Sequence, residues 1–298
     1  MGRLFFVLCL AATLSAQSRQ VAITFDDLPR GGDLGPRELA PLRQMTLQLL
    51  DSLKGIPVTG FVNANKLDAA AMRQILKIWQ QHGADLGNHT YSHANLNQIP
   101  FEAYADDILQ GEPAIIEALG GHRPVYFRHP YLFTGKNLET KQRLEKFLAE
   151  HGYKIAPVTL DNADYMFALV YQSARQDDPA LSQRARDAFI PYMESVVSFF
   201  ESRSKEVVGR EFPQILLLHA NQLNADSMTD LLQMMRRRGY QFISLTEALR
   251  DPAYRQPDEY VGTGGFSWIH RWSQTKGMPP KGEPDEPSWI SEEFRRRQ

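Results

Sequence analysis

The chain has 298 residues, of which 43% are hydrophobic and 23% charged. This composition excludes a disordered, collagen-like or low-complexity protein, and the length allows one large α/β domain or two smaller ones. Because 33 Lys and Arg nearly balance 35 Asp and Glu, the chain has no excess of positive charge that would favour a nucleic acid as partner.

The first 16 residues are typical of a secretory signal peptide. Arg3 precedes an unbroken apolar run over residues 4–12, and small residues follow that run. A bilayer span needs about 20 residues, so we expect cleavage after Ala16 and no stable membrane span. Cleavage also removes Cys9, the only cysteine, which excludes disulfides, thiolate metal ligands and a cysteine nucleophile. We therefore expect an exported protein, periplasmic or secreted, whose oligomeric state the sequence leaves open.

From Gln20 onward, short apolar runs alternate with segments of helical periodicity, which predicts repeated strand–helix units. The predicted strands are 21–25, 57–62, 84–87, 125–127, 154–156, 214–218 and 241–243. The predicted helices lie around 42–53, 72–79, 144–148 and 231–235, and Gly83 is well placed to end the second. Parallel strands joined in this way need helices on their outer faces, so the pattern predicts a barrel or an open doubly wound sheet.

Two regions depart from this alternation of strands and helices. Residues 166–212 form a predicted helical insertion, with one long amphipathic helix over about 182–204 that packs against the barrel wall. Residues 251–298 hold six prolines, five glycines and three of the four tryptophans. We expect an irregular strap over the domain surface, with an aromatic sugar-binding platform as the alternative. The chain thus divides into a signal peptide (1–16), a main domain (17–250) and a C-terminal extension (251–298).

Polar side chains follow five separated apolar runs at the points where these runs end. They are Asp26 and Asp27 after 21–25, His89 and His93 after 84–87, Arg128 after 125–127, Asp161 and Asp164 after 158–160, and His219 after 214–218. Barrel enzymes build their active sites at the carboxyl ends of the strands, so we expect these groups to converge.

His89 and His93 stand four residues apart. On one helical turn this spacing places both imidazoles on one face, within reach of one metal ion, although an isolated pair of this kind is more often structural. No Glu follows His89, so the zinc protease pattern His-Glu-x-x-His is absent. A carboxylate from elsewhere must complete a metal site, and Asp26 or Asp27 is available. Taken alone, the two aspartates are better explained as a helix or turn cap.

Five short motifs, taken together, favour a metal site over a helix or turn cap. They are Thr24-Phe25-Asp26-Asp27, His89-Thr90-Tyr91-Ser92-His93, Arg128-His129-Pro130-Tyr131, Asp161-Asn162-Ala163-Asp164-Tyr165 and Leu217-Leu218-His219. In this order they resemble the polysaccharide deacetylase family, also called the NodB-homology domain or carbohydrate esterase family 4, over about residues 20–249. The resemblance implies an α/β fold, a distorted (β/α) barrel of about seven parallel strands. Leu28 stands where this family commonly has Gly, and Tyr165 where Trp is usual, so the resemblance leaves the substrate open.

The resemblance implies a metal site and a base. Asp27, His89 and His93 would bind a divalent metal ion, in this family usually Zn²⁺, with one position open for water and substrate. Asp26 would be the general base that activates the water, and Arg128 would hold Asp26 ionised and oriented.

The resemblance also implies an acid and a substrate pocket. His219 would be the general acid that protonates the leaving amine, and Asp164 would pair with it and raise its pKa. The backbone N–H of Tyr131 would bind the developing oxyanion. Leu217 would line the pocket for the acetyl methyl group, and Tyr165 would contribute to the substrate groove.

The function that follows is that of an exported, metal-dependent hydrolase that removes N-acetyl groups from acetylated amino-sugar glycans. Two alternatives keep the same machinery: an O-acetyl ester deacetylase of polysaccharide, and a hydrolase of a small non-sugar amide. A non-catalytic glycan-binding protein is the alternative from another class. Such a protein would be expected to lack a metal ligand or the base, and Asp26, Asp27, His89 and His93 are all present.

Overall fold

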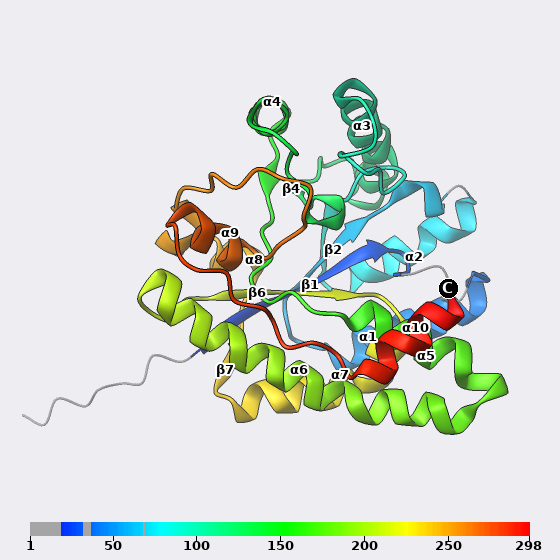
Figure 1. Ribbon diagram of the computed structural model, residues 1–298. Helices are drawn as coiled ribbons and strands as arrows, with labels where there is room; N and C mark the ends of the chain where they lie inside the picture. The colour runs from blue at the N-terminus through cyan, green and yellow to red at the C-terminus, as the bar shows by residue number, and fades with distance from the viewer. Residues whose placement is uncertain (1–18, 32–36, 68) are drawn as a thin grey trace, which may run out of the picture.

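The computed structural model describes residues 19–31, 37–67 and 69–298, so the predicted signal peptide lies outside the described residues. Within this part of the chain, parallel strands form one curved seven-stranded sheet in the order β5-β4-β3-β2-β1-β6, with β7 paired to the start of β1 (Figure 1). The strands are β1 (Arg19–Leu28), β2 (Val58–Val62), β3 (Asp85–Asn88), β4 (Tyr126–Phe127), β5 (Lys154–Ile155), β6 (Gln214–His219) and β7 (Tyr240–Phe242). The seven predicted strands and their parallel arrangement are confirmed.

The segment that follows β5 joins the two outer edges of this sheet. Ile155 pairs with Phe127 of β4, and a little further along the same segment Leu160 bridges Leu216 of β6. The N–H of Leu217 donates to the carbonyl of Leu160 at 3.2 Å. One stretch of chain therefore touches both edges, which makes the sheet the distorted barrel that the motifs predict.

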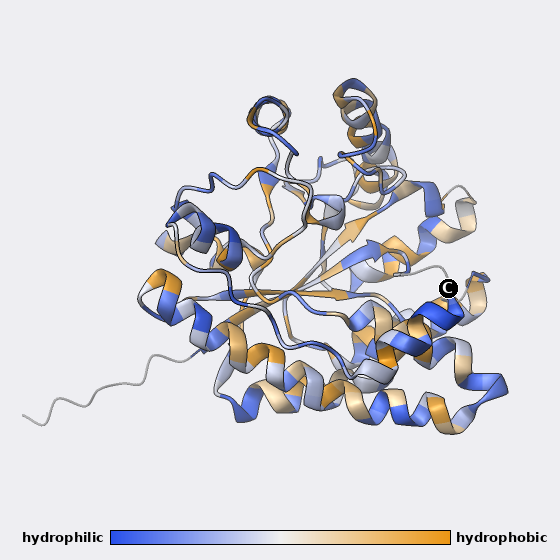
Figure 2. Cartoon of the chain, in the orientation of Figure 1, coloured by the Kyte–Doolittle hydropathy of each residue, from blue (hydrophilic) through white to orange (hydrophobic). Residues whose placement is uncertain are grey.

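Helices cover the outside of the sheet. They are α1 (Leu39–Ser52), α2 (Ala70–Gln81), α3 (Phe101–Ala118), α4 (Leu138–Glu150), α5 (Asp164–Asp177), α6 (Pro179–Val208), α7 (Gln222–Arg237) and α8 (Leu245–Ala248). Figure 2 shows hydrophobic residues along the strands and polar residues on the outer sides of the helices. In α2, Ile75, Leu76 and Trp79 are fully buried on one side. Gly83 has a φ of 82° just after this helix, a left-handed conformation that favours glycine.

The long helix predicted over about 182–204 is confirmed as part of α6, and the insertion also contains α5, which was not predicted. α6 is longer than predicted: Asp178 accepts a hydrogen bond from the N–H of Leu181 at 3.0 Å at its start, and Gly209 ends it with a φ of 82°. α5 packs against α6 and begins at Asp164. The insertion therefore starts inside one of the sequence motifs and is continuous with the barrel.

The C-terminal segment is also more regular than the predicted strap. It contains η3 (Pro252–Arg255), α9 (Trp268–Thr275) and α10 (Ser288–Arg297), where α9 packs on α6 and α10 on α5 (Figure 1, orange to red). Trp268 and Trp272 are buried in the core, and Trp289 lies under the guanidinium of Arg184 at 4.0 Å. The tryptophans anchor the segment, which contradicts the alternative of a sugar-binding platform.

None of the helices in the described ranges combines the length and the apolar character that crossing a lipid bilayer requires.

Candidate active site

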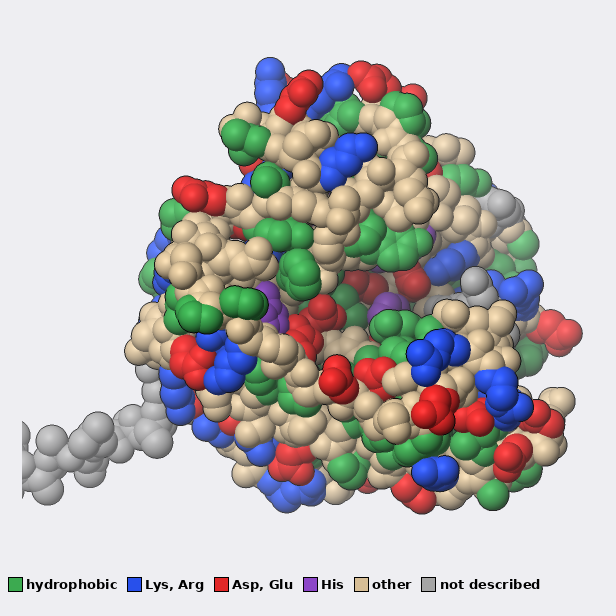
Figure 3. Space-filling model, in the orientation of Figure 1, with side chains coloured by type: hydrophobic (Ala, Val, Ile, Leu, Met, Phe, Trp, Pro, Cys, Tyr) green, Lys and Arg blue, Asp and Glu red, His purple; other side chains and the backbone are tan. Residues whose placement is uncertain are grey.

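A pocket of about 550 Å³ opens at the carboxyl ends of the strands. It is lined by Asp26, Asp27, His89, His93, His129, Tyr131, Leu132, Phe133, Asp161, Asn162, Tyr165, Leu217, His219 and Gly265. Figure 3 shows acidic side chains and histidines gathered in the hollow at the centre of this face. Arg128 and Asp164 lie behind the lining and are fully buried. The structure therefore brings together all the residues that the motifs single out.

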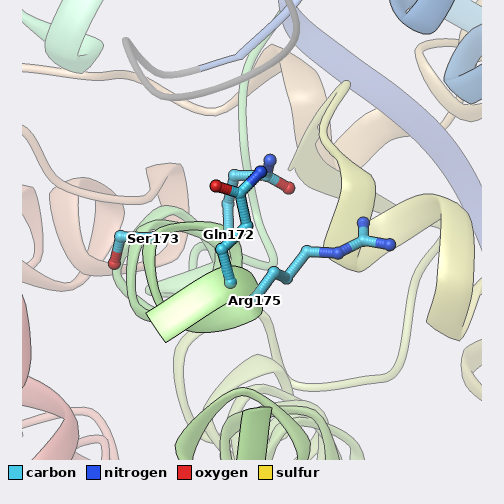
Figure 4. A pocket seen from close by; sticks show the side chains of 4 residues that line it. Gln172, Ser173 and Arg175 are labelled. Carbon is cyan, nitrogen blue, oxygen red and sulfur yellow. The ribbon is translucent and has the colours of Figure 1, made fainter. Parts of the chain in front are cut away.

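A second hollow, of about 530 Å³, lies on α5 and has a different character. It is lined by Gln172, Ser173, Arg175 and Gln176, and Ser173 points away from Gln172 and Arg175 (Figure 4). These four side chains offer neither a carboxylate nor an imidazole, so the hollow has no group suited to metal binding or acid–base chemistry. The pocket at the barrel mouth is the candidate active site.

Asp27, His89 and His93 direct their ligand atoms toward one point. Asp27 Oδ1 lies 3.6 Å from His89 Nε2 and 3.5 Å from His93 Nε2. Zinc bonds of 2.0–2.1 Å in a tetrahedron separate the ligand atoms by about 3.3 Å, so the spacing fits such an ion. Asp27 Oδ1 is also buried without a hydrogen-bond partner among the described residues, as expected of an oxygen that a cation would satisfy.

The imidazole of His89 is held in the form that a metal ligand needs. Its Nδ1 donates to the carbonyl oxygen of Arg128 at 2.8 Å, which leaves the lone pair of Nε2 facing Asp27. Burial and the neighbouring His93 hold the pKa of His89 well below its usual value, and burial lowers the pKa of His93 as well. Both rings are therefore neutral and able to bind a cation.

The two histidines do not share a helical turn, so this part of the prediction is wrong. Thr90 and His93 have φ values of 65° and 59°, and the segment between them is a loop. Asn88 Oδ1 accepts from the N–H of Thr90 at 2.8 Å, and the carboxylate of Asp107 in α3 accepts from the N–H of Ser92 at 3.1 Å. Contacts to β3 and α3, rather than helical hydrogen bonds, bring the imidazoles together.

Asp26 and Asp27 line the same pocket because β1 ends irregularly. On a regular strand adjacent side chains point to opposite faces. Here the register with β2 shifts between Phe25 and Leu28, and Asp27 has a φ of 68°. The left-handed residue turns the chain so that both carboxylates reach the barrel mouth.

Asp26 lies next to the three ligand atoms in a buried environment. Arg128 Nη1 lies 3.4 Å from Asp26 Oδ2, while Arg128 Nη2 donates to Thr24 Oγ1 at 3.0 Å. Burial raises the pKa of Asp26 to about 6, and the Arg128 cation opposes this rise. Asp26 Oδ1 has no hydrogen-bond partner within the described ranges, so it is placed to accept a proton near neutral pH.

Asp27 is kept ionised by a residue that the sequence motifs do not include. Burial alone would raise the pKa of Asp27, but the Lys66 cation holds this pKa well below its usual value. Lys66, in η1 (Ala64–Leu67), places Nζ 3.7 Å from Asp27 Oδ2, and Asn63 Nδ2 donates to the carbonyl of His89 at 2.6 Å. Both residues closely follow β2, so the search for polar residues at strand ends could have found them.

His219 and Asp164 form a hydrogen-bonded pair on the other side of the pocket. His219 Nδ1 donates to Asp164 Oδ1 at 2.7 Å, and Asn224 Nδ2 donates to Asp164 Oδ2 at 2.7 Å and to the carbonyl of His219 at 2.8 Å. Burial lowers the pKa of His219, but Asp164 more than offsets this and the pKa rises to about 9. Asn224 lies in the first turn of α7, shortly after the end of β6, and none of the five motifs includes it.

Tyr131, Tyr165 and Leu217 lie around these polar groups. Tyr131 and Tyr165 are 50% and 46% exposed at the pocket rim, whereas Leu217 is buried in the lining. The Tyr131 ring meets that of His93 edge to face, with 4.4 Å between centroids. Tyr165 packs between His219 and Phe294 of α10, so the C-terminal segment supports the rim.

Residues 14–156 match the family model described as polysaccharide deacetylase. A peptidoglycan-N-acetylglucosamine deacetylase from Bacillus cereus is 25% identical over 234 residues, which are 76% of this chain and 66% of that protein. A chitin deacetylase from Arthroderma benhamiae is 30% identical over 154 residues, 50% of this chain and 36% of that protein. The match to a chitin deacetylase from Colletotrichum lindemuthianum, at 25% identity, covers 78% of this chain and 79% of that protein. The chain thus spans about two thirds of the length of the Bacillus cereus relative and about one third of the length of the Arthroderma benhamiae relative.

Solved structures share the fold at low sequence identity. A polysaccharide deacetylase from Bacillus cereus superposes with a TM-score of 0.54 at 19% identity, covering 76% of this chain and 91% of that one. A CE4 family pseudoenzyme from Bacillus anthracis superposes with a TM-score of 0.53 at 14% identity, covering 78% of this chain and 66% of that one. Because an enzyme and a pseudoenzyme share this fold, the site residues must decide the activity. Residues 14–156 match the polysaccharide deacetylase family by sequence, and the described chain shares its fold with a solved polysaccharide deacetylase.

Proposed function

We propose that this protein is a metal-dependent hydrolase that removes N-acetyl groups from acetylated amino-sugar glycans. The observation that carries the proposal is the grouping of Asp27, His89 and His93 around one point, with the carboxylate of Asp26 beside them. This arrangement combines a cation site with a separate proton acceptor, which is what hydrolysis by activated water requires. A protein that only binds glycan needs neither group.

Asp27, His89 and His93 would hold the metal ion, and Zn²⁺ is the ion we propose because it favours tetrahedral sites of imidazole and carboxylate ligands. When bound, such an ion lowers the pKa of water to about 7 and polarises a carbonyl oxygen. The hydrogen bond from His89 Nδ1 to the carbonyl of Arg128 orients this ligand from behind.

Asp26 acts as the general base in this proposal. Its unpartnered Oδ1 accepts the proton of the attacking water, and its buried position keeps its basicity above that of an exposed carboxylate. Arg128 is the positioning residue, because its guanidinium lies against Asp26 Oδ2 and is itself fixed by Thr24.

His219 acts as the general acid. The imidazolium donates its Nε2 proton to the leaving nitrogen, while Nδ1 stays bound to Asp164. A pKa of about 9 in the absence of metal keeps His219 protonated at neutral pH, so the proton is available when the C–N bond breaks.

The substrate would lie across the pocket rim, with its acetyl methyl group against Leu217 and its sugar ring between Tyr131 and Tyr165. The backbone N–H of Tyr131 would donate to the developing oxyanion. A pocket of about 550 Å³ is large enough for one sugar unit with its acetamido group.

The relatives favour an N-acetylated glycan. Their names specify peptidoglycan N-acetylglucosamine in one case and chitin in two others. The predicted signal peptide fits an enzyme that meets such polymers outside the cytoplasm, and export is part of the proposal. Mass spectrometry of the protein recovered from periplasm or medium should give a chain that begins at Gln17.

Acetate release tests the function directly. Purified protein should release acetate from N-acetylglucosamine oligomers, lose this activity after chelation and regain it with Zn²⁺. Asp26→Asn, which keeps the metal ligands, is the matched inactive variant. If neither N-acetylated nor O-acetylated glycans yield acetate with Zn²⁺ present, the proposal is wrong.

A further inference from the structure

His129 lines the active-site pocket but has no part in the proposed reaction. The side chain is 1% exposed, and neither ring nitrogen has a hydrogen-bond partner within the described residues. A neutral imidazole carries one donor and one acceptor, and burying both without partners costs free energy. Such groups in a pocket wall are suited to a ligand that supplies the missing hydrogen bonds.

Aromatic neighbours fix the His129 ring. Trp268 stacks on it with 6.3 Å between centroids and 28° between planes, and Phe127 meets it edge to face at 5.1 Å. The backbone N–H of Trp268 donates to the carbonyl of Val158 at 2.7 Å, which ties the residue that carries the stacked indole to the barrel. Burial and the cation of Arg271 hold the pKa of His129 well below its usual value, so the ring stays neutral.

Asp161 is a second polar residue in the same lining, and it is partly buried. Its Oδ1 accepts from the N–H of Asn162 at 2.9 Å, and Oδ2 receives no hydrogen bond from the part of the chain that the structure describes. Burial and the nearby Glu283 raise the pKa of Asp161 to about 7. This carboxyl group therefore has a free oxygen that can accept a hydrogen bond or, once protonated, donate one.

The C-terminal segment completes this wall. Gly265 lies so close to the backbone of Tyr131 that a Cβ atom would stand 1.8 Å from the Tyr131 carbonyl oxygen. The segment is held there by Asn97 Nδ2, which donates to the carbonyl of Thr263 at 3.3 Å, and by Arg271, which binds Asp258 and Thr134. The wall is therefore built in advance of any ligand.

We propose that His129 and Asp161 form a subsite that binds hydroxyl groups of the sugar ring in the pocket, and thereby select a glycan over other acetylated compounds. A hydroxyl group both donates and accepts, so it matches a neutral imidazole and a free carboxyl oxygen. A cationic group would face Arg128, Arg271 and Lys141, whose charges act on His129. An apolar group would leave the polar atoms unsatisfied. The inference rests on the proposed deacetylase function.

His129→Phe tests the subsite, because phenylalanine keeps the ring stacked on Trp268 and removes both nitrogens. The variant should lower kcat/KM for N-acetylglucosamine oligomers about 3- to 10-fold more than kcat/KM for 4-nitrophenyl acetate, which has no hydroxyl groups. The lower kcat/KM for the oligomers should come from a higher KM, with kcat little changed. His129→Gln, whose amide donates and accepts, should recover part of the lost kcat/KM. His122→Phe, at an exposed position, is the matched control and should leave the substrate ratio unchanged.

Asp161→Asn is the second test, since it keeps the acceptor for Asn162 and exchanges Oδ2 for a donor. This variant should also lower kcat/KM for N-acetylglucosamine oligomers more than kcat/KM for 4-nitrophenyl acetate. Equal losses on glycan and ester in His129→Phe, or no change in KM for the oligomers, would overturn the inference.

Calorimetry separates the failure of this inference from that of the proposed function. In metal-free protein, where no turnover interferes, a trimer of N-acetylglucosamine should bind about 3- to 10-fold more weakly to His129→Phe than to the wild type. If the wild type binds the trimer but never releases acetate, the function is wrong and the subsite stands. If the two proteins bind the trimer equally, the subsite is wrong.

Discussion

Asp164 binds His219 twice. The ring Nδ1 of His219 donates to Asp164 Oδ1 at 2.7 Å, and the backbone N–H of His219 donates to Asp164 Oδ2 at 2.8 Å. The first residue of α5 is thereby fixed to the last residue of β6, and the imidazole is held in one tautomer with Nε2 left for the substrate. The helical insertion, which starts at Asp164, therefore helps to position the proposed acid.

Asp164→Asn should lower the pKa of His219 in the metal-free protein from about 9. The carboxylate of Asp164 stabilises the imidazolium, and without it only the charges of Asp27 and Asp26 oppose burial, which favours the neutral ring. The stabilising contribution of the pair is fully present below the ordinary pKa of about 6.5 and is lost as the pH rises through about 9. NMR titration of the His219 ring gives the pKa, and denaturation at pH 6 and pH 10 gives the stability. An unchanged pKa would refute the role of Asp164.

Asn224→Ala should lower kcat about 10-fold with little effect on KM, because Asn224 orients Asp164 and His219 without facing the pocket. Asn221→Ala is the matched control. Asn221 caps α7 by accepting from the N–H of Asn224 at 2.8 Å, so its loss should cost about 1 kcal/mol of stability and leave kcat unchanged. Steady-state kinetics and chemical denaturation of both variants check this. A loss of kcat equal in the two variants would point to a general disturbance of α7.

Asp26→Asn and Asp27→Asn should separate the base from the metal site. Asp26→Asn should keep one metal ion per chain and lose about 10²–10⁴-fold in rate, because the ligand set is intact and the proton acceptor is gone. Asp27→Asn should lose the metal ion itself. Elemental analysis and acetate release measure both properties.

Zn²⁺ should also stabilise the wild type and Asp26→Asn by mass action, by about 2.7 kcal/mol at a free ion concentration 100-fold above Kd. Asp27→Asn should show no such gain in thermal denaturation. Stabilisation of all three proteins to the same degree would place the ion elsewhere.

The strand ends of this fold could be predicted because their signals are local. Each buried strand is a short apolar run, and most of the proposed site residues outside α5 follow such a run within a few positions. Parallel strands place their carboxyl ends at one edge, so sequence order alone predicts that Asp26, His89 and His219 converge.

The parts that were missed depend on tertiary contacts. The loop that joins His89 and His93 is shaped by Asn88 and by Asp107 of α3, a helix that was not predicted. Helical spacing was therefore the wrong reason for a correct grouping of the two imidazoles. The helices α9 and α10 escaped prediction because each is short and is set among prolines and glycines, and packing on α6 and α5 stabilises them.

Gly265→Ala should disturb the pocket, although this glycine lies in a segment that looks like a surface strap from sequence. The added Cβ would stand 1.8 Å from the carbonyl oxygen of Tyr131, and this neighbour is backbone that a rotamer change cannot move. Either the C-terminal segment or the Tyr131 turn must shift, so we expect a lower melting temperature and a lower kcat/KM for N-acetylglucosamine oligomers. Gly282→Ala, in the same segment, is the matched control and should change neither, because a Cβ atom added there would meet no described atom within 4 Å. If Gly265→Ala behaves like Gly282→Ala, the C-terminal segment does not shape the pocket, and deleting its contacts should leave catalysis intact.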